Sequence, residues 1–109
     1  MAYDLEKLFA AVDESISKSP MLPLYCLSQR LRCSHPMIER AVYLKTSLHF
    51  REYRNRKIFA LIKVLVKEGH SAKRISLEIG YRWPEHLSRF IAKYAGCTFR
   101  ELARNVIAE

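Results

Sequence analysis

Two arginines, Arg40 and Arg89, have the side-chain type and the placement that recognition of nucleobases requires. A guanidinium group presents a rigid fork of N–H donors, which can pair with O6 and N7 of a guanine in the major groove. The two arginines occupy matching places in two similar segments, each on the outward polar side. A phosphate contact or an ion pair with a nearby glutamate would suit the same side chains. We predict base contacts by both arginines, with these two alternatives open.

Further side chains of the same two segments are candidates for base contacts. A glutamate can accept a hydrogen bond from cytosine N4, although near phosphates it more often repels them or orients an arginine. Trp83 can pack under its turn or reach a thymine methyl group, and we expect it to pack. The additional candidates for base contacts are Glu39, Glu85, Pro36, His86 and Ser88.

A basic cluster around Tyr53 is the main candidate for contacts with phosphates. Cations near a helix can neutralise phosphate charges, but a solvated helix face would have the same composition. We expect phosphate contacts from this cluster and from three later cations. The cluster comprises Arg51, Arg54, Arg56 and Lys57, and the later candidates are Arg82, Lys93 and Arg100.

The charge balance of the chain favours a polyanionic partner. The 109 residues include 19 Lys and Arg against 11 Asp and Glu, which gives a net charge of +8. Such an excess favours nucleic acid first and an anionic membrane second. No apolar run approaches the roughly 18 residues of a membrane span, and the N-terminus lacks the basic-then-apolar order of a signal peptide. We therefore expect double-stranded DNA, and no membrane, as the partner.

The cysteines and histidines assemble into no catalytic or metal-binding motif. Cys26, Cys33 and Cys97 are scattered and odd in number, which indicates a reducing cytosol. No C-x-x-C pair accompanies Cys26, Cys33 and His35, so structural thiols are favoured over a zinc site. No nucleophile, base and orienting group are recognisable together. We expect a cytoplasmic protein that is not an enzyme and has no cofactor.

The segment from 71 to 104 predicts two short helices joined by a glycine turn, followed by a third helix. Ile75 and Ile79 form one apolar face, and Gly80 follows where a helix C-cap requires a positive φ. Pro84 is suited to the first turn of the next helix, because its missing N–H would be unpaired there. This order is that of a helix-turn-helix.

The second of these helices separates an apolar from a polar face. Leu87, Ile91 and Tyr94 form the inward stripe, and the polar candidates listed above lie on the other faces. Thr98 and Glu101 have the spacing of a capping box, which opens the last helix.

The N-terminal part predicts a similar arrangement. An amphipathic helix follows Asp4, its expected N-cap, and ends near Lys18. A second helix covers about 24–32, and Ser34 can cap a third helix with Pro36 in its first turn. Between the two parts, residues 48–67 predict a long linker helix with a regular stripe. Its apolar positions are Ile58, Leu61, Ile62, Leu65 and Val66.

These elements predict an all-α fold of seven helices, in which two helix-turn-helix subdomains are joined by the linker helix. The first subdomain covers about 4–47, the linker helix about 48–68 and the second subdomain about 70–109.

At these residues the chain resembles the DNA-binding domain of AraC/XylS-type transcription regulators. The C-terminal signature of that family runs I-A-x-x-x-G-F, then F-S-R-x-F-K, then G-x-T-P-x-x-Y-R. Leu87 and Ile91 replace its two Phe residues, and Arg32 and Ser47 stand at or near glycine positions of its first unit. A non-glycine residue in a left-handed conformation costs about 1 kcal/mol. The matching positions are Ile75, Gly80, Ser88, Arg89, Gly96, Thr98 and Arg104, with Leu31, Ser34, Arg40 and Val42 in the first unit.

The resemblance implies a sequence-specific regulator of transcription, which we expect to be an activator. Helices 35–46 and 84–94 would read two successive major grooves, about 34 Å apart. It also implies a bacterial protein that binds DNA as a monomer, with RNA polymerase as a further partner, and that is either a stand-alone member or an excised domain. The alternative is a helical adaptor that binds protein on the same scaffold, with little specificity for DNA.

Overall fold

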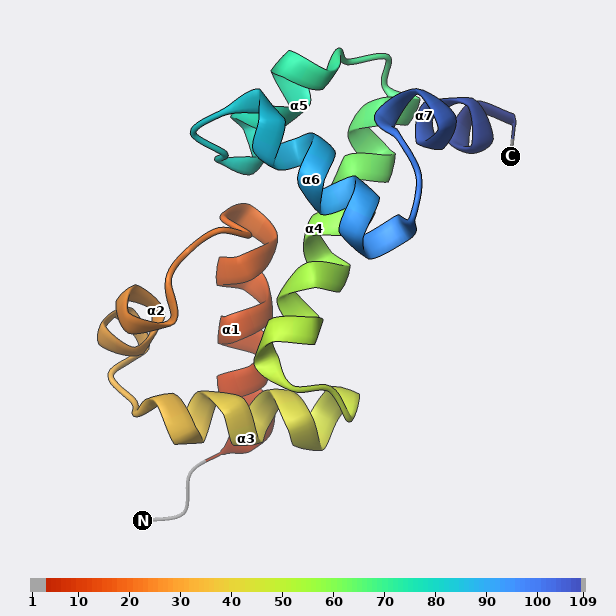
Figure 1. Ribbon diagram of the computed structural model, residues 1–109. Coiled ribbons are helices and arrows are strands. Elements are labelled where there is room, and N and C mark those ends of the chain that lie inside the picture. Colours follow the sequence, from red (N-terminus) through yellow and green to blue (C-terminus); the bar gives the residue numbers. More distant parts are fainter. Residues whose placement is uncertain (1–3, 109) are drawn as a thin grey trace. The chain divides into compact units, whose positions relative to one another are not determined.

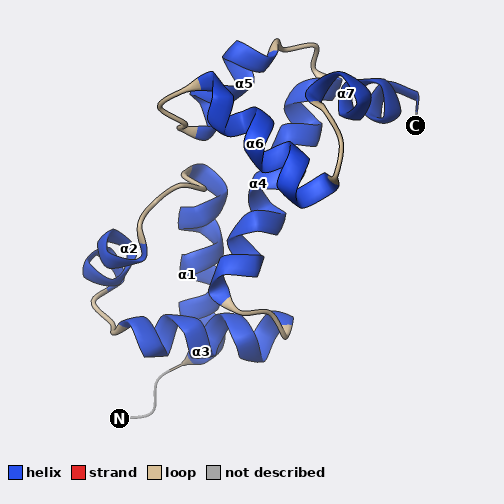
Figure 2. Ribbon diagram, in the orientation of Figure 1, coloured by secondary structure: helices blue, strands red, loops and turns tan. Residues whose placement is uncertain are grey.

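A computed structural model describes residues 4–108, and this part of the chain contains seven α-helices and no strand (Figures 1 and 2). It forms two compact units that divide between Lys57 and Ile58, inside the longest helix. The predicted fold class is therefore confirmed, while residues 1–3 and 109 of the predicted subdomains lie outside the described residues. The helices are α1 (Leu5–Lys18), α2 (Leu24–Leu31), α3 (His35–Thr46), α4 (Phe50–Lys67), α5 (Ala72–Ile79), α6 (Pro84–Ala95) and α7 (Phe99–Ala108).

The first unit is built on α1, which packs against both α2 and α3. The side chain of Asp4 caps α1 by accepting hydrogen bonds from the backbone N–H groups of Glu6 and Lys7, each at 3.1 Å. Apolar residues at helical spacing are buried together because they share one face of each helix. The core of this unit consists of Leu8, Val12, Ile16, Leu27, Ile38, Ala41, Val42, Phe50 and Tyr53.

Both ends of α3 are fixed by local chemistry. Ser34 Oγ accepts a hydrogen bond from the Met37 N–H at 3.3 Å, and Pro36 lies in the first turn, as the sequence predicts. At the other end Ser47 has φ 62°, and Arg32 after α2 has φ 54°. These are the only non-glycine residues with positive φ among those described. Ser47 stands at a glycine position expected from the resemblance, and Arg32 stands near one.

Replacing Ser47 with glycine should stabilise the first unit. Ser47 is exposed and left-handed, and glycine has no Cβ to clash in that conformation. We expect the free energy of unfolding to rise by about 1 kcal/mol in a urea titration. The matched control is Ser88→Gly, at an exposed position inside α6, where we expect a loss of about 0.5–1 kcal/mol. Equal effects of the two changes would contradict this interpretation.

The second unit consists of the C-terminal part of α4 together with α5, α6 and α7. Gly80 ends α5 with φ 104°, and Pro84 is the first residue of α6. Both positions are as the sequence predicts. Phe50 and Tyr53 of α4 belong to the first core, whereas later residues of the same helix belong to the second. The second core consists of Ile58, Ile62, Leu65, Val66, Ile75, Ile79, Leu87, Ile91, Leu102 and Val106.

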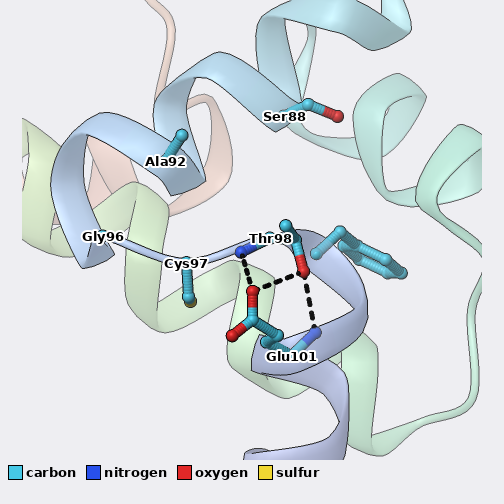
Figure 3. A pocket seen from close by; sticks show the side chains of 7 residues that line it. Ser88, Ala92, Gly96, Cys97, Thr98 and Glu101 are labelled. Atoms are coloured by element: carbon cyan, nitrogen blue, oxygen red, sulfur yellow. Dashed lines mark hydrogen bonds between the residues drawn. The ribbon is translucent and has the colours of Figure 1, made fainter.

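The predicted capping box at the start of α7 is confirmed (Figure 3). Thr98 Oγ1 accepts a hydrogen bond from the Glu101 N–H at 3.1 Å, and the Glu101 carboxylate accepts from the Thr98 N–H at 3.2 Å. The Thr98 hydroxyl also donates to the same carboxylate at 3.0 Å. This reciprocal arrangement satisfies N–H groups that would otherwise have no helical acceptor.

A candidate nucleic-acid interface

The outward face of α6 carries the predicted polar candidates of the second unit. Glu85, Ser88, Arg89 and Lys93 are all exposed, whereas Leu87 and Ile91 on the opposite side are buried. The separation follows from the helical period, because the apolar pair is spaced four residues apart. Arg89 forms no salt bridge with any described residue. Its guanidinium group therefore remains available to a ligand.

The turn before α6 differs from the prediction at Trp83. We expected this ring to pack under the turn, but 54% of the residue is exposed. The backbone explains the difference: Trp83 is the N-cap of α6, a position half outside the helix, and has an extended conformation. Arg82 is also exposed, with its guanidinium carbon 5.6 Å from the Trp83 ring centroid.

His86 is less accessible than the other candidates of α6. It is half-buried, and its ring lies edge-on to Tyr81 with 6.2 Å between centroids. Burial raises the pKa of the Tyr81 hydroxyl to about 12. The contact with Tyr81 gives His86 a packing role in addition to any contact with a ligand.

A groove of about 490 Å³ runs along α6 beside the turn that leads into α7 (Figure 3). Ser88 and Ala92 contribute from α6, and Cys97 and Thr98 contribute from the turn. The Glu101 carboxylate lines the same groove and already occupies the N–H of Thr98. This negative charge disfavours the binding of an anion at the start of α7. The neighbouring Arg100 lies in the first turn of that helix and is exposed.

The corresponding face of α3 in the first unit is also exposed. Pro36, Glu39 and Arg40 are accessible, opposite the buried Ile38 and Val42. Arg40 forms no salt bridge within residues 4–108. The exposed face of α3 continues into two large apolar side chains that the sequence did not single out as accessible ligand contacts, Tyr43 and Leu44.

The basic cluster does not form one exposed surface, and Arg54 is the clearest correction. Its guanidinium group donates a hydrogen bond to the Leu22 carbonyl and lies 4.8 Å from the Phe50 ring centroid. Burial lowers the pKa of Arg54, and its Nε atom has no acceptor within the described chain. Arg54 thus connects α4 to the α1–α2 connection, and this position does not favour the predicted phosphate contact.

Lys57 is likewise held inside the first unit. Its Nζ lies 2.6 Å from the Asp13 carboxylate and 5.7 Å from the Tyr53 ring centroid. Tyr53 donates a hydrogen bond to the same carboxylate. Burial alone would raise the pKa of Asp13, but the hydrogen bonds from Lys57 and Tyr53 and the charge of Lys57 lower it overall. The ammonium group of Lys57 is therefore neutralised by a partner on α1.

Arg51 and Arg56 remain the accessible members of the basic cluster. Both are exposed, and Arg56 Nε lies 3.7 Å from the Glu52 carboxylate. An exposed pair of this kind contributes little to stability and can exchange for another anion. These two side chains, and not all four, retain the placement expected of phosphate contacts.

The described residues contain no group of three or more His, Cys, Asp or Glu side chains that could hold a metal ion. All three cysteines have free thiols, and burial raises the pKa of the Cys33 thiol. Over the same range, none of the helices has the length and apolar character needed to cross a membrane.

The fold is therefore of the class that repeats a helix-turn-helix in two units, with α2 and α3 in the first and α5 and α6 in the second. Among solved structures, the chain is similar to the C-terminal domain of the two-component response regulator yesN from Fusobacterium nucleatum. That likeness has a TM-score of 0.75 at 17% identity and covers 93% of this chain and 99% of that one.

The chain is also similar to a DNA-binding transcriptional dual regulator from Escherichia coli K-12. Here the TM-score is 0.70 at 14% identity, with 100% of this chain and 97% of the other covered. No family model matches the chain, and no curated protein sequence matches it significantly. The two structures confirm the fold expected from the AraC/XylS resemblance.

Proposed function

We propose that this chain binds double-stranded DNA sequence-specifically and regulates transcription. The observation that supports this most strongly is the face of α6, where an accessible Arg89 lies among polar residues opposite a buried apolar stripe. The net charge of +8 favours a polyanion. One of the similar structures is described as a response regulator and the other as a DNA-binding transcriptional regulator.

The second unit would place α6 in a major groove. An α-helix fits this groove, where each base pair presents a distinct pattern of donors and acceptors. Arg89 would pair with O6 and N7 of a guanine, while Ser88 and Glu85 would contact neighbouring base edges. His86 would contribute at most an edge contact, because its ring packs against Tyr81.

The first unit would use α3 in the same way, with Arg40 as its guanine-binding side chain and Glu39 and Pro36 beside it. Two such helices would read two successive grooves, about 34 Å apart. We propose further that the protein binds as a monomer in the bacterial cytoplasm and activates transcription through contact with RNA polymerase. These last points follow from the family resemblance alone.

Contacts with phosphates would come from the accessible cations around the two helices. Replacing any one of them with glutamine should weaken binding to specific and random duplexes alike. It should also reduce the slope of log affinity against log salt by about 0.9. The residues to be changed singly are Arg82, Lys93, Arg100, Arg51 and Arg56.

The matched control for these changes is Lys18→Gln. Lys18 is exposed and pairs with Glu14 at 3.0 Å on α1, a helix outside the helix-turn-helix pair. In fluorescence anisotropy at several salt concentrations, Lys18→Gln should show the same slope of log affinity against log salt as the unchanged protein. If all five cation variants kept the slope of the unchanged protein, the assignment of phosphate contacts would be wrong.

Selection of bound sequences from a random duplex pool tests the proposed function as a whole. We expect enrichment of a bipartite motif with a guanine in each half, separated by about one helical turn. A helical adaptor for proteins would enrich no motif and would bind random duplex DNA weakly at low salt. Failure to enrich any motif would reject sequence-specific binding.

A further inference from the structure

Trp83, the single tryptophan of the chain, occupies a position at which tryptophan is unfavourable for the helix. It is the N-cap of α6, and its side chain makes no capping hydrogen bond. The helices α3 and α5 are capped instead by Ser34 and Ser71, whose hydroxyls accept hydrogen bonds from the first turn. Serine, threonine, aspartate and asparagine are the residues that stabilise this position. α6 therefore lacks the side-chain cap that α1, α3, α5 and α7 have.

The backbone of Trp83 is held firmly although its ring is exposed. Its carbonyl accepts a hydrogen bond from the His86 N–H at 3.1 Å and another from Ser76 Oγ at 3.5 Å. Ser76 is buried in α5. The residue after Trp83 is Pro84, whose ring fixes its own φ near the helical value. The ring thus projects from a rigid turn, and its 54% exposure does not result from a loose loop.

The surroundings of the ring suit a nucleic acid. The Arg82 guanidinium lies 5.6 Å from the ring centroid, so a cation and an apolar surface are presented side by side. N-terminal residues of a recognition helix are those that contact base edges. The apolar group that a major groove offers is the C5-methyl of thymine.

We propose that Trp83 determines specificity by an apolar contact with a thymine methyl group in the groove that α6 enters. This proposal rests on the proposed function, since it requires α6 to lie in a major groove. Trp83 precedes Arg89 by six residues, or about 9 Å along the helix axis at 1.5 Å per residue. The thymine therefore lies within about three base pairs of the guanine that Arg89 contacts, since base pairs are about 3.4 Å apart.

Replacing thymine with deoxyuridine tests the contact, because it removes only the methyl group. Each thymine of the selected site is changed in turn, and binding is measured by anisotropy of labelled DNA. For the unchanged protein we expect the replacement at one position to lower the binding affinity about fourfold, because the methyl group contributes about 0.8 kcal/mol. For Trp83→Ser the same replacement should cause no loss of affinity. This variant should already bind the thymine-containing duplex at least fourfold more weakly than the unchanged protein does.

Serine is chosen because it restores a capping hydroxyl, which offsets the packing lost with the ring. A urea titration should confirm that Trp83→Ser remains folded, and Trp83→Phe, which keeps an apolar ring, should retain part of the sensitivity to the methyl group. Equal sensitivity of the unchanged protein and Trp83→Ser to deoxyuridine would overturn the proposal. An equal loss of affinity by Trp83→Ser for selected and random duplexes would also overturn it, because it would indicate a contact with the sugar-phosphate backbone.

The emission of Trp83 separates failure of this inference from failure of the proposed function. We expect the selected duplex to change the intensity of tryptophan emission at the same DNA concentration at which anisotropy reports binding. Binding by anisotropy without any change in emission would overturn the role of Trp83 and leave the proposed function intact. No binding to any duplex would reject both.

Discussion

Replacing Arg89 with alanine should reduce affinity for the selected duplex by about fivefold to 150-fold, corresponding to about 1–3 kcal/mol for one bidentate contact with guanine. Affinity for random duplex DNA should fall only slightly, because a base contact contributes little where the base does not match. The side chain is exposed and forms no salt bridge within the described part of the chain. The free energy of unfolding should therefore stay within about 0.5 kcal/mol of its original value.

The matched variant Arg89→Lys separates charge from geometry. Lysine keeps the positive charge but lacks the planar fork that pairs with O6 and N7 together. We expect it to lose specific affinity much as alanine does, while its binding to random DNA is unchanged. Equal losses on selected and random duplexes for Arg89→Ala in a shift assay would identify a phosphate contact instead.

Replacing Ile91 with alanine should cost about 2–5 kcal/mol of stability, the range for large-to-small changes in a packed core. Ile91 is completely buried on the inner face of α6, in one cluster with Leu87 and Ile75. Since small domains are stable by only about 5–15 kcal/mol, this single change removes a large part of the total. A urea titration followed by circular dichroism measures the loss.

Ile107→Ala is the matched control for the core change. It is the same substitution in the same unit, but Ile107 is 72% exposed on α7. We expect a change within about 0.5 kcal/mol. Similar effects of the two substitutions would show that the inner face of α6 is not packed as described.

The features of the fold that depend on local chemistry could be predicted from the sequence. Gly80 ends α5, Pro84 starts α6, and Thr98 and Glu101 form the capping box, because each signal acts within a few residues of the chain. The polar face of α6 was equally predictable, since burial of Leu87 and Ile91 fixes which residues point outward.

The basic cluster was predictable only in part, because its contacts are distant in sequence. Arg54 donates to Leu22, 32 residues earlier, and Lys57 pairs with Asp13 across α1 and α4. A composition rich in cations gives no indication of which ones are taken up by such contacts. Arg51 and Arg56, which lack them, kept the exposure that was expected.

Trp83 shows a different limit of sequence reasoning. Tryptophan is usually much buried, so packing under the turn was the reasonable expectation. An N-cap residue, however, lies half outside its helix, and the extended backbone at Trp83 leaves the ring exposed. The position of Pro84 at the first turn was the available signal, because it makes the preceding residue the N-cap.

The proposed function requires that α3 and α6 give this chain specificity for a DNA sequence. The most direct test is competition between the selected duplex and a scrambled duplex of equal length at physiological salt. The account predicts a ratio of affinities of about 10³ or more, as for specific DNA-binding proteins. That ratio should fall towards unity when Arg40 and Arg89 are both changed to alanine. A ratio near unity for the unchanged protein would contradict the account.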